Sequence, residues 1–199
     1  MDRNLFRIKL GKTKIRMKIL SFQCLLIFVV QINTLNAQKV MISKSSEISF
    51  FSKTPLRDIE ADNKATTSLI NLDTKDIAIK IPVKSFVFPN KLMQEHFNEN
   101  YLETEKYPFS SFRGKINESL DLEKDGKYNV TATGKITLHG VEKSQTFKGI
   151  ATIKDKKITL DSVFDVSLAD YNIDIPKIVF EEIAEKVKVT FKINYEEKK

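Results

Sequence analysis

Cysteine, tryptophan and histidine are scarce in this chain of 199 residues. It has one cysteine, Cys24, two histidines and no tryptophan. A single cysteine cannot form an intramolecular disulfide, so an apolar core has to hold the fold, and the chain is long enough to build one. Neither His96 nor His139 has a second histidine at a spacing typical of metal sites. We expect His96 to pack or cap within a helix and His139 to occupy a turn, where its side chain bonds nearby backbone.

The motifs of the common catalytic sites are also missing. The chain has no glycine-rich phosphate loop, no Gly-x-Ser-x-Gly elbow and no His-Glu-x-x-His pair. Its acidic pairs, Asp58 with Glu60 and Glu181 with Glu182, lie among lysines, as is typical of solvated surface. The sequence therefore predicts no catalytic residue, no metal and no cofactor.

The positive charge of the chain is confined to one end. The 33 basic and 26 acidic residues give a formal charge of +7, and the segment 1–37 contributes seven bases and one acid to it. The remaining 162 residues carry a net charge of only +1, with lysine and glutamate interleaved. Nucleic-acid binding usually requires a basic patch on the folded domain. The charge distribution therefore predicts no nucleic-acid partner.

The order of residues in the segment 1–37 is that of a secretory signal peptide. A basic stretch is followed by the apolar run 19–30 and then by polar residues that lead to Ala37. The apolar run is too short to span a membrane, so we expect cleavage after Ala37 and no stable membrane anchor afterwards. Met17 is a possible true start, with the same mature chain. No small residue stands just before Cys24, as a lipoprotein signal would require, so we expect no lipid anchor. Because Cys24 lies inside the apolar run, the mature domain, 38–199, has no thiol.

Period-two alternation of apolar and polar residues dominates the mature chain. It is clearest over 127–138 and recurs over 147–153, 158–168 and 187–195, as well as more briefly near Ile48 and over 77–83. Short turns are predicted at four places, and residues 112–168 then form a meander of four long strands; the turns are Asp73-Thr74, Asp125-Gly126, His139-Gly140 and Asp155-Lys156. We expect Pro82 at a sheet edge or bulge.

Helical spacing interrupts this pattern twice. The segment 90–102 places Leu92, Met93, Phe97 and Tyr101 on one face, which predicts an amphipathic helix packed on the sheet. A second, short helical segment is expected at about 178–184. No linker or repeat divides the chain. The predicted fold is one mainly β domain, an antiparallel barrel of about eight strands, since closure removes the sheet edges.

The interior of this barrel combines small and large residues. Ala132, Gly134, Gly149 and Ala151 lie on the apolar face of two neighbouring strands, whereas phenylalanines such as Phe50 occupy other elements. An eight-stranded barrel is about the size at which side chains fill the interior or a single ligand occupies it. From composition alone, a densely packed core and a ligand cavity both remain open.

Two stretches of sequence resemble the YceI-like family of secreted, polyisoprenoid-binding proteins. One is 93–109, a predicted helix that leads into Tyr-Pro, and the other is 134–141, similar to that family's Gly-x-Leu-Thr-x-x-Gly-Val turn. The segments 52–63 and 170–173 resemble the variant common among Bacteroidetes-type bacteria. The resemblance extends over about 40–195. Arginines of the better-known branch are absent here, so no charged contact to a ligand head group carries over.

The resemblance implies a lipocalin-like barrel in the bacterial periplasm that binds, sequesters or transports a long apolar lipid of isoprenoid type and is not an enzyme. The lipid-lining residues that it implies are apolar positions on the inner strands and beneath the helix, namely Phe50, Ile79, Ile81, Met93, Phe97, Phe112, Ile136, Phe164 and Val166. The expected state is a monomer or homodimer.

Two alternatives stay open at this point. One is a structural or protein-interaction module of the cell envelope with a filled core. The other is an enzyme that uses the barrel as a pocket, with His96, Tyr107 or Tyr171 as acid or base.

Overall fold

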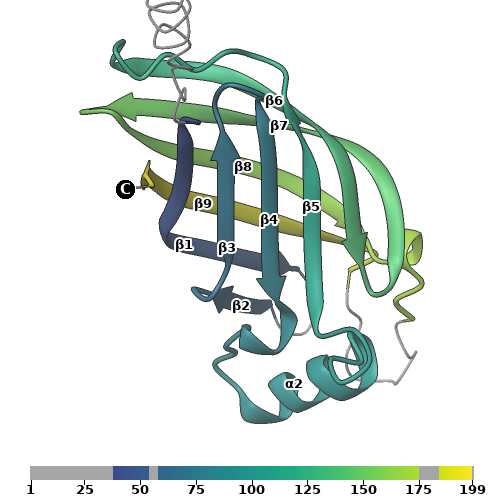
Figure 1. Ribbon diagram of the computed structural model, residues 1–199. Coiled ribbons are helices and arrows are strands. Elements are labelled where there is room, and N and C mark those ends of the chain that lie inside the picture. The colour runs from purple at the N-terminus through teal and green to yellow at the C-terminus, as the bar shows by residue number, and fades with distance from the viewer. Residues whose placement is uncertain (1–37, 54–57, 175–183, 199) are drawn as a thin grey trace, which may run out of the picture. The chain divides into compact units, whose positions relative to one another are not determined.

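Nine antiparallel strands make up most of the structure, a computed structural model that describes residues 38–53, 58–174 and 184–198 (Figure 1). In chain order they are β1 (Val40–Ser52), β2 (Ile59–Asn63), β3 (Thr67–Asn71), β4 (Asp76–Pro82), β5 (Phe109–Ile116), β6 (Gly126–Leu138), β7 (Val141–Lys154), β8 (Lys157–Ser167) and β9 (Lys186–Glu197). Pro82, which has no N–H to donate, is the last residue of β4, as suits a strand end.

Eight of these strands close into a barrel. The hydrogen-bonded order is β1-β3-β4-β5-β6-β7-β8-β9, and ten residue pairs between β1 and β9 complete the circle. The extra strand β2 lies beside the second half of β1, because β1 is long enough to pair first with β3 and then with β2. The prediction of a mainly β, lipocalin-like antiparallel barrel of about eight strands is confirmed.

The meander predicted over 112–168 is present as β5 to β8. The turns His139-Gly140 and Asp155-Lys156 connect their strands directly, and all four residues have positive φ, between 49° and 74°, as two-residue hairpins of this kind require. The prediction of a turn at Asp125-Gly126 was wrong, since the β5–β6 connection runs over 117–125. The Asp125 carboxylate instead accepts a hydrogen bond from the Asp155 N–H of the next hairpin, at 3.2 Å.

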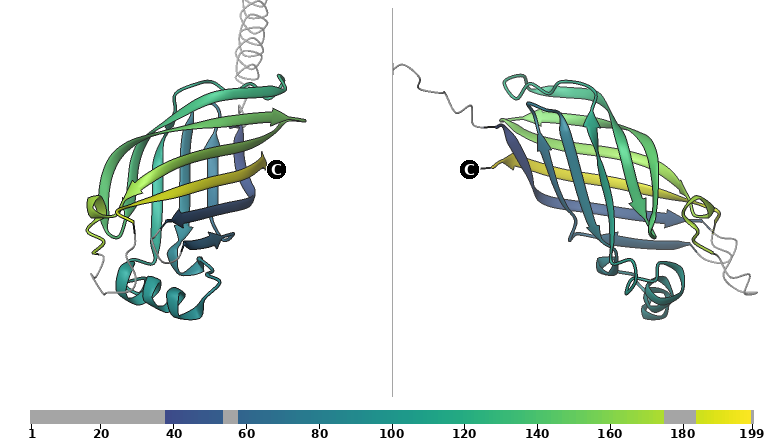
Figure 2. Two further views of the ribbon diagram at one scale, coloured as in Figure 1. Left: turned by 180° about the vertical axis from the view of Figure 1, so that it is seen from behind. Right: turned by 45° about the vertical axis from the view of Figure 1, so that its right-hand side comes forward.

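The predicted helix over 90–102 is confirmed with slightly shorter bounds. After the 3-10 turn η1 (Val83–Ser85), helix α2 (Lys91–His96) continues into the π-helical turn η2 (Phe97–Tyr101). Asn90 caps it, since its Oδ1 accepts hydrogen bonds from the backbone N–H groups of Leu92 and Met93. The helix lies across one end of the barrel (Figure 2). No helix among the described residues is long and apolar enough to cross a membrane.

One expectation concerns a segment near the C-terminus. The short helix expected at about 178–184 lies outside the described residues except for Ala184, which is not helical. A 3-10 turn that the sequence did not predict, η3 (Ala169–Tyr171), follows β8.

The sequence also did not predict strands β2 and β3. Polar residues occupy inward positions in both of them, Asn63 in β2 and Ser68 in β3, and these interrupt the alternation.

These two inward polar residues belong to a buried hydrogen-bond network beside β1. The Asn63 side chain, fully buried, donates to the Pro82 carbonyl and accepts from Ala65 N–H and from the Thr66 hydroxyl. The Ser68 hydroxyl donates to the Ala78 carbonyl and lies 2.7 Å from the Tyr195 hydroxyl. Because every polar side chain named here has a partner, this corner of the core avoids the cost of unpaired buried groups.

Tyr195 makes the stability of the barrel sensitive to alkaline pH. Its phenol is fully buried, and desolvation raises the pKa of Tyr195 far above its ordinary value, although the bond to Ser68 acts in the opposite direction. In the unfolded chain the phenol ionises near pH 10. Above that pH the folded state binds one more proton than the unfolded state, so the free energy of unfolding falls by about 1.4 kcal/mol per pH unit.

We therefore expect Tyr195→Phe to lower stability at neutral pH by about 1 kcal/mol, through the lost hydrogen bond, and to lessen the fall of stability above pH 10 by about 1.4 kcal/mol per pH unit. Urea titrations from pH 8 to pH 11.5 measure both effects. The control is Tyr128→Phe, since the Tyr128 hydroxyl bonds the exposed Lys124 carbonyl. If Tyr195→Phe keeps the wild-type slope above pH 10, the assignment to Tyr195 fails.

Candidate functional site

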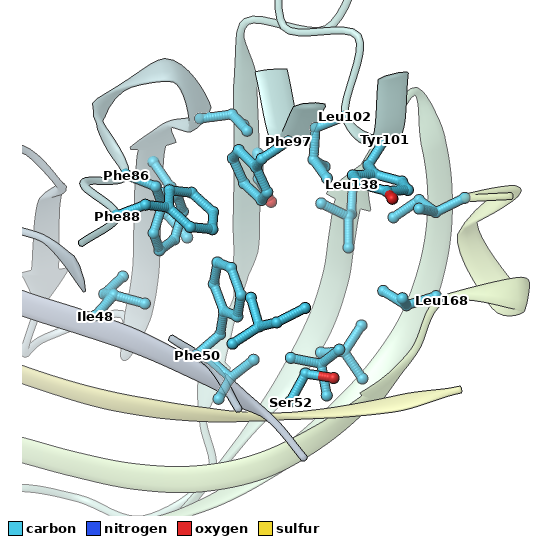
Figure 3. A pocket seen from close by; sticks show the side chains of 18 of the residues that line it. Ile48, Phe50, Ser52, Phe86, Phe88, Phe97, Tyr101, Leu102, Leu138 and Leu168 are labelled. Carbon is cyan, nitrogen blue, oxygen red and sulfur yellow. The ribbon is translucent and has the colours of Figure 1, made fainter. Parts of the chain in front are cut away.

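A cavity of about 170 Å³ lies between α2 and the barrel end that it covers, and we call it the helix-side cavity (Figure 3). Its walls come from the second half of β1, the end of β4, the segment after η1, the helix and the inner faces of β6, β8 and β9. The lining residues are Ile48, Phe50, Ser52, Ile59, Ile81, Val83, Phe86, Phe88, Met93, His96, Phe97, Tyr101, Leu102, Ser110, Ile136, Leu138, Phe164, Val166, Leu168, Ile173, Val187 and Val189.

Four phenylalanine rings form one side of the helix-side cavity. Phe50 of β1 contacts the rings of Phe86, Phe88 and Phe97 with centroid distances of 5.4 to 5.6 Å, and Phe97 also contacts Phe86 and Phe88 at 5.7 and 4.9 Å. Figure 3 shows these rings directed toward one another from the strand, the helix and the intervening segment. This aromatic cluster fixes α2 to the barrel through apolar contacts.

A second cavity of about 80 Å³, which we call the inner cavity, lies deeper in the barrel. It shares Ile81, Ser110, Ile136 and Phe164 with the helix-side cavity, so the two adjoin. Its remaining walls include Ile77, Ile79, Phe112, Ile116, Val130, Ala132, Phe147, Lys148, Gly149, Leu160, Ser162 and Phe191. The rings of Phe112, Phe147 and Phe164 are in contact here, with centroid distances of 5.3 Å and 4.4 Å.

The small residues of β6 and β7 have two different surroundings. Ala132 and Gly149 border the inner cavity. Gly134 does not, because a Cβ at this position would overlap the Arg113 carbonyl oxygen and the Cα of Gly114 on the facing strand. The two possibilities left open by the sequence therefore both occur, dense packing at Gly134 and free space beside Ala132.

The helix-side cavity carries almost no polarity. None of its lining residues is acidic, lysine or arginine, and its polar side chains are those of Ser52, His96, Tyr101 and Ser110. Ser52 accepts a hydrogen bond from the Ala184 N–H, and Ser110 donates one to the Thr137 carbonyl. A charged group placed here would lose its hydration without gaining a partner of opposite charge. The cavity therefore suits an uncharged, apolar guest.

All nine residues predicted as lipid-lining border one of the two cavities. Phe50, Met93, Phe97 and Val166 line the helix-side cavity, Ile79 and Phe112 line the inner one, and Ile81, Ile136 and Phe164 line both. Sequence reasoning missed Phe86 and Phe88, although their alternation with Val87 is a period-two signal. It also missed Ile173, which no short-range pattern could place near α2, and it did not select Leu168, although Leu168 ends the alternation over 158–168.

Three of the segments that carry the family resemblance, 93–109, 134–141 and 170–173, come into contact in the structure. His139, whose side chain is 9% exposed, directs Nδ1 to the Tyr171 carbonyl at 3.1 Å and Nε2 to the Glu103 carboxylate at 3.0 Å. The Tyr107 ring packs edge-on against it, 4.6 Å between centroids. His139 thus bonds backbone distant in sequence rather than nearby, because the hairpin tip contacts η3.

The candidate acid and base residues do not form one site. His96 lines the helix-side cavity, whereas Tyr107 and Tyr171 belong to the His139 contact and are not among the cavity-lining residues. Within the described part of the chain, no group of three histidine, cysteine, aspartate or glutamate side chains could hold a metal ion.

A closed antiparallel barrel with an apolar interior and a helix over one end is the architecture of lipocalin-like proteins. Comparison with protein families gives the more specific assignment. The YceI-like domain matches residues 34–195, and the chain belongs to this family. No curated protein matches the chain in a sequence search.

Several solved structures share this fold at low sequence identity. BcnA of Burkholderia cenocepacia is 20% identical with a TM-score of 0.62, over 75% of this chain and 95% of its own. A polyisoprenoid-binding domain from Saccharophagus degradans, implicated in plant cell wall breakdown, is 15% identical with a TM-score of 0.70, over 81% and 99%. The YceI protein of Campylobacter jejuni is 14% identical with a TM-score of 0.56, over 74% and 89%.

Proposed function

We propose that this protein binds a long, uncharged lipid chain of isoprenoid type inside its barrel and that it sequesters or transports this lipid without catalysing a reaction. The single observation that carries the proposal is the uncharged lining of the helix-side cavity, which adjoins a second apolar cavity. The polyisoprenoid-binding domain of Saccharophagus degradans has the same fold, which supports the choice of ligand class.

The energetics favour an apolar chain. Each methylene group moved from water into such a lining contributes about 0.8 kcal/mol, so a few isoprene units offset the cost of association. A cavity of about 150 Å³ is known to hold one benzene ring. The two cavities, about 170 and 80 Å³, therefore accept a short stretch of chain as they stand. A longer chain requires the rings of Phe50, Phe88 and Phe97 to turn aside.

We further propose that residues 1–37 direct export and are removed after Ala37, which places the barrel in the periplasm. The basic stretch followed by the apolar run 19–30 supports this. The intact mass of the protein recovered from its native host tests it, because a chain that begins at Gln38 differs in mass from any uncleaved form.

Mass spectrometry of an organic extract from natively purified protein tests lipid binding directly. We expect one class of long apolar lipid at close to one molecule per barrel. The control is the same protein after denaturation, delipidation and refolding, whose extract should contain none. A native extract without lipid, together with no binding of an uncharged apolar probe by the refolded protein, contradicts the proposal.

The second candidate is an envelope module with a filled core, and the modest volume of the two cavities favours it. It predicts that a probe such as N-phenyl-1-naphthylamine does not bind, whereas lipid binding predicts saturable fluorescence enhancement. The same titration therefore separates the two functions.

A further inference from the structure

Strands β7 and β8 are paired along only part of their length, over six residues of each. They leave the turn at Asp155-Lys156 side by side, and their pairing runs only from Lys154 and Lys157 to Gly149 and Ser162. Beyond that point the two strands form no backbone pairs with each other. The unpaired residues, all within the described part of the chain, are Val141–Lys148 of β7 and Val163–Ser167 of β8. By contrast, β6 and β7 pair over thirteen residues and β8 and β9 over ten.

These two unpaired edges form what we call the seam, which widens toward the end of the barrel that carries α2 (Figures 1 and 2). The inward-facing positions of β7 confirm the separation. Gln145, on the same face of β7 as Phe147 and Ala151, is exposed to solvent, whereas Ala151 in the paired part is fully buried. β7 therefore separates from β8 on the N-terminal side of Gly149, although it stays paired with β6 there.

Side chains, not backbone hydrogen bonds, span the seam. At its narrow end the Ser162 hydroxyl donates to the Lys148 carbonyl at 2.6 Å. In the middle, the Phe147 and Phe164 rings meet at 4.4 Å. At the wide end an exposed ion pair joins Lys143 to Asp170 at 2.8 Å. Exposed ion pairs and single ring contacts are weak and exchange readily.

Both cavities reach the seam. Phe147, Lys148, Gly149 and Ser162 line the inner cavity, and the inward side chains of the unpaired part of β8, Phe164 and Val166, line the helix-side cavity. The Phe147–Phe164 contact thus lies where the inner cavity meets the seam.

We infer that the seam between β7 and β8 is the mouth through which the lipid chain enters and leaves the barrel, with the Phe147–Phe164 ring pair as its gate. The inference rests on the proposed function. Lifting α2 instead would disrupt the three ring contacts of Phe97 and uncover the aromatic cluster. Parting the seam disrupts one ring contact, one exposed ion pair and the hydrogen bonds of Ser162 and His139, but no strand ladder. The seam is therefore a passage through the barrel wall that opens without breaking the sheet.

A reversible cross-link across the wide end tests this. In a Cys24→Ser background, the Lys143→Cys/Asp170→Cys protein is joined by a short, cleavable bis-maleimide, and stopped-flow fluorescence follows N-phenyl-1-naphthylamine. We expect association and dissociation to slow at least tenfold, with the equilibrium Kd within twofold of the uncross-linked protein, and both rates to recover on cleavage. Closing a passage changes rates without changing the bound state.

The matched control is Lys154→Cys/Lys157→Cys, which joins the same strands where they are already paired and exposed, and whose cross-link should leave the rates unchanged. A second variant, Phe147→Ala, removes half of the gate and should speed both rates at least threefold. Binding with unchanged rates in the seam-linked and Phe147→Ala proteins would overturn the seam alone. No saturable binding in any form, wild type included, would overturn the proposed function and the seam with it.

Discussion

Val166→Trp should abolish most of the binding of apolar ligands, with a loss of affinity of at least fiftyfold. Val166 lines the helix-side cavity from β8. Since about 150 Å³ holds one benzene ring, an indole placed in a cavity of about 170 Å³ leaves no room for a lipid chain. The measurement is a titration with an uncharged fluorescent probe, together with lipid content after native purification.

The control for this variant is Val163→Trp on the same strand. Val163 faces outward and is 61% exposed, so an indole there reaches solvent and should leave the affinity unchanged. Overfilling the cavity costs stability, about 1 to 3 kcal/mol, and far-UV circular dichroism checks that both variants are folded. A folded Val166→Trp protein that binds as tightly as wild type would show that the ligand does not occupy this cavity.

Gly134→Val should lower the free energy of unfolding by about 3 kcal/mol or more, enough to threaten folding of a marginally stable domain. The new side chain would meet the backbone of Arg113 and Gly114, and backbone held in a strand ladder cannot rotate away. Urea denaturation, with circular dichroism as the signal, measures the loss.

Ala132→Val is the matched control, two residues away on the same face of β6. Ala132 borders the inner cavity, so the added methyl groups enter free space and should change stability by less than about 1 kcal/mol. A loss for Gly134→Val as small as that for Ala132→Val would contradict the close approach of β5 and β6 and would place free space beside Gly134 as well.

The candidate site was predictable from the sequence where its residues belong to regular elements. Phe164 and Val166 follow the alternation of a long strand, and Met93 and Phe97 follow helical spacing, so each could be assigned an inward face. Phe86 and Ile173 lie beside a 3-10 turn or in a connection. Their approach to the cavity depends on where the ends of distant strands come together, which local periodicity does not encode.

The turn chemistry shows the same limit. Asp125-Gly126 has the composition of a two-residue hairpin, yet the structure uses Asp125 to bond the neighbouring turn at Asp155. Whether a dipeptide with this propensity forms the turn depends on the partners that the tertiary fold brings near it.

By itself, the sequence determined that this protein is an antiparallel β-barrel with a helix over 90–102 and an uncharged interior, because side-chain periodicity and composition fix which face of each element is buried. Only the tertiary structure decided how that interior is divided. Whether a small residue leaves a cavity, as at Ala132, or admits a neighbouring backbone, as at Gly134, depends on the distance between strands that are far apart in the chain. The partial pairing of β7 with β8 is likewise a property of the assembled barrel, which no single strand records.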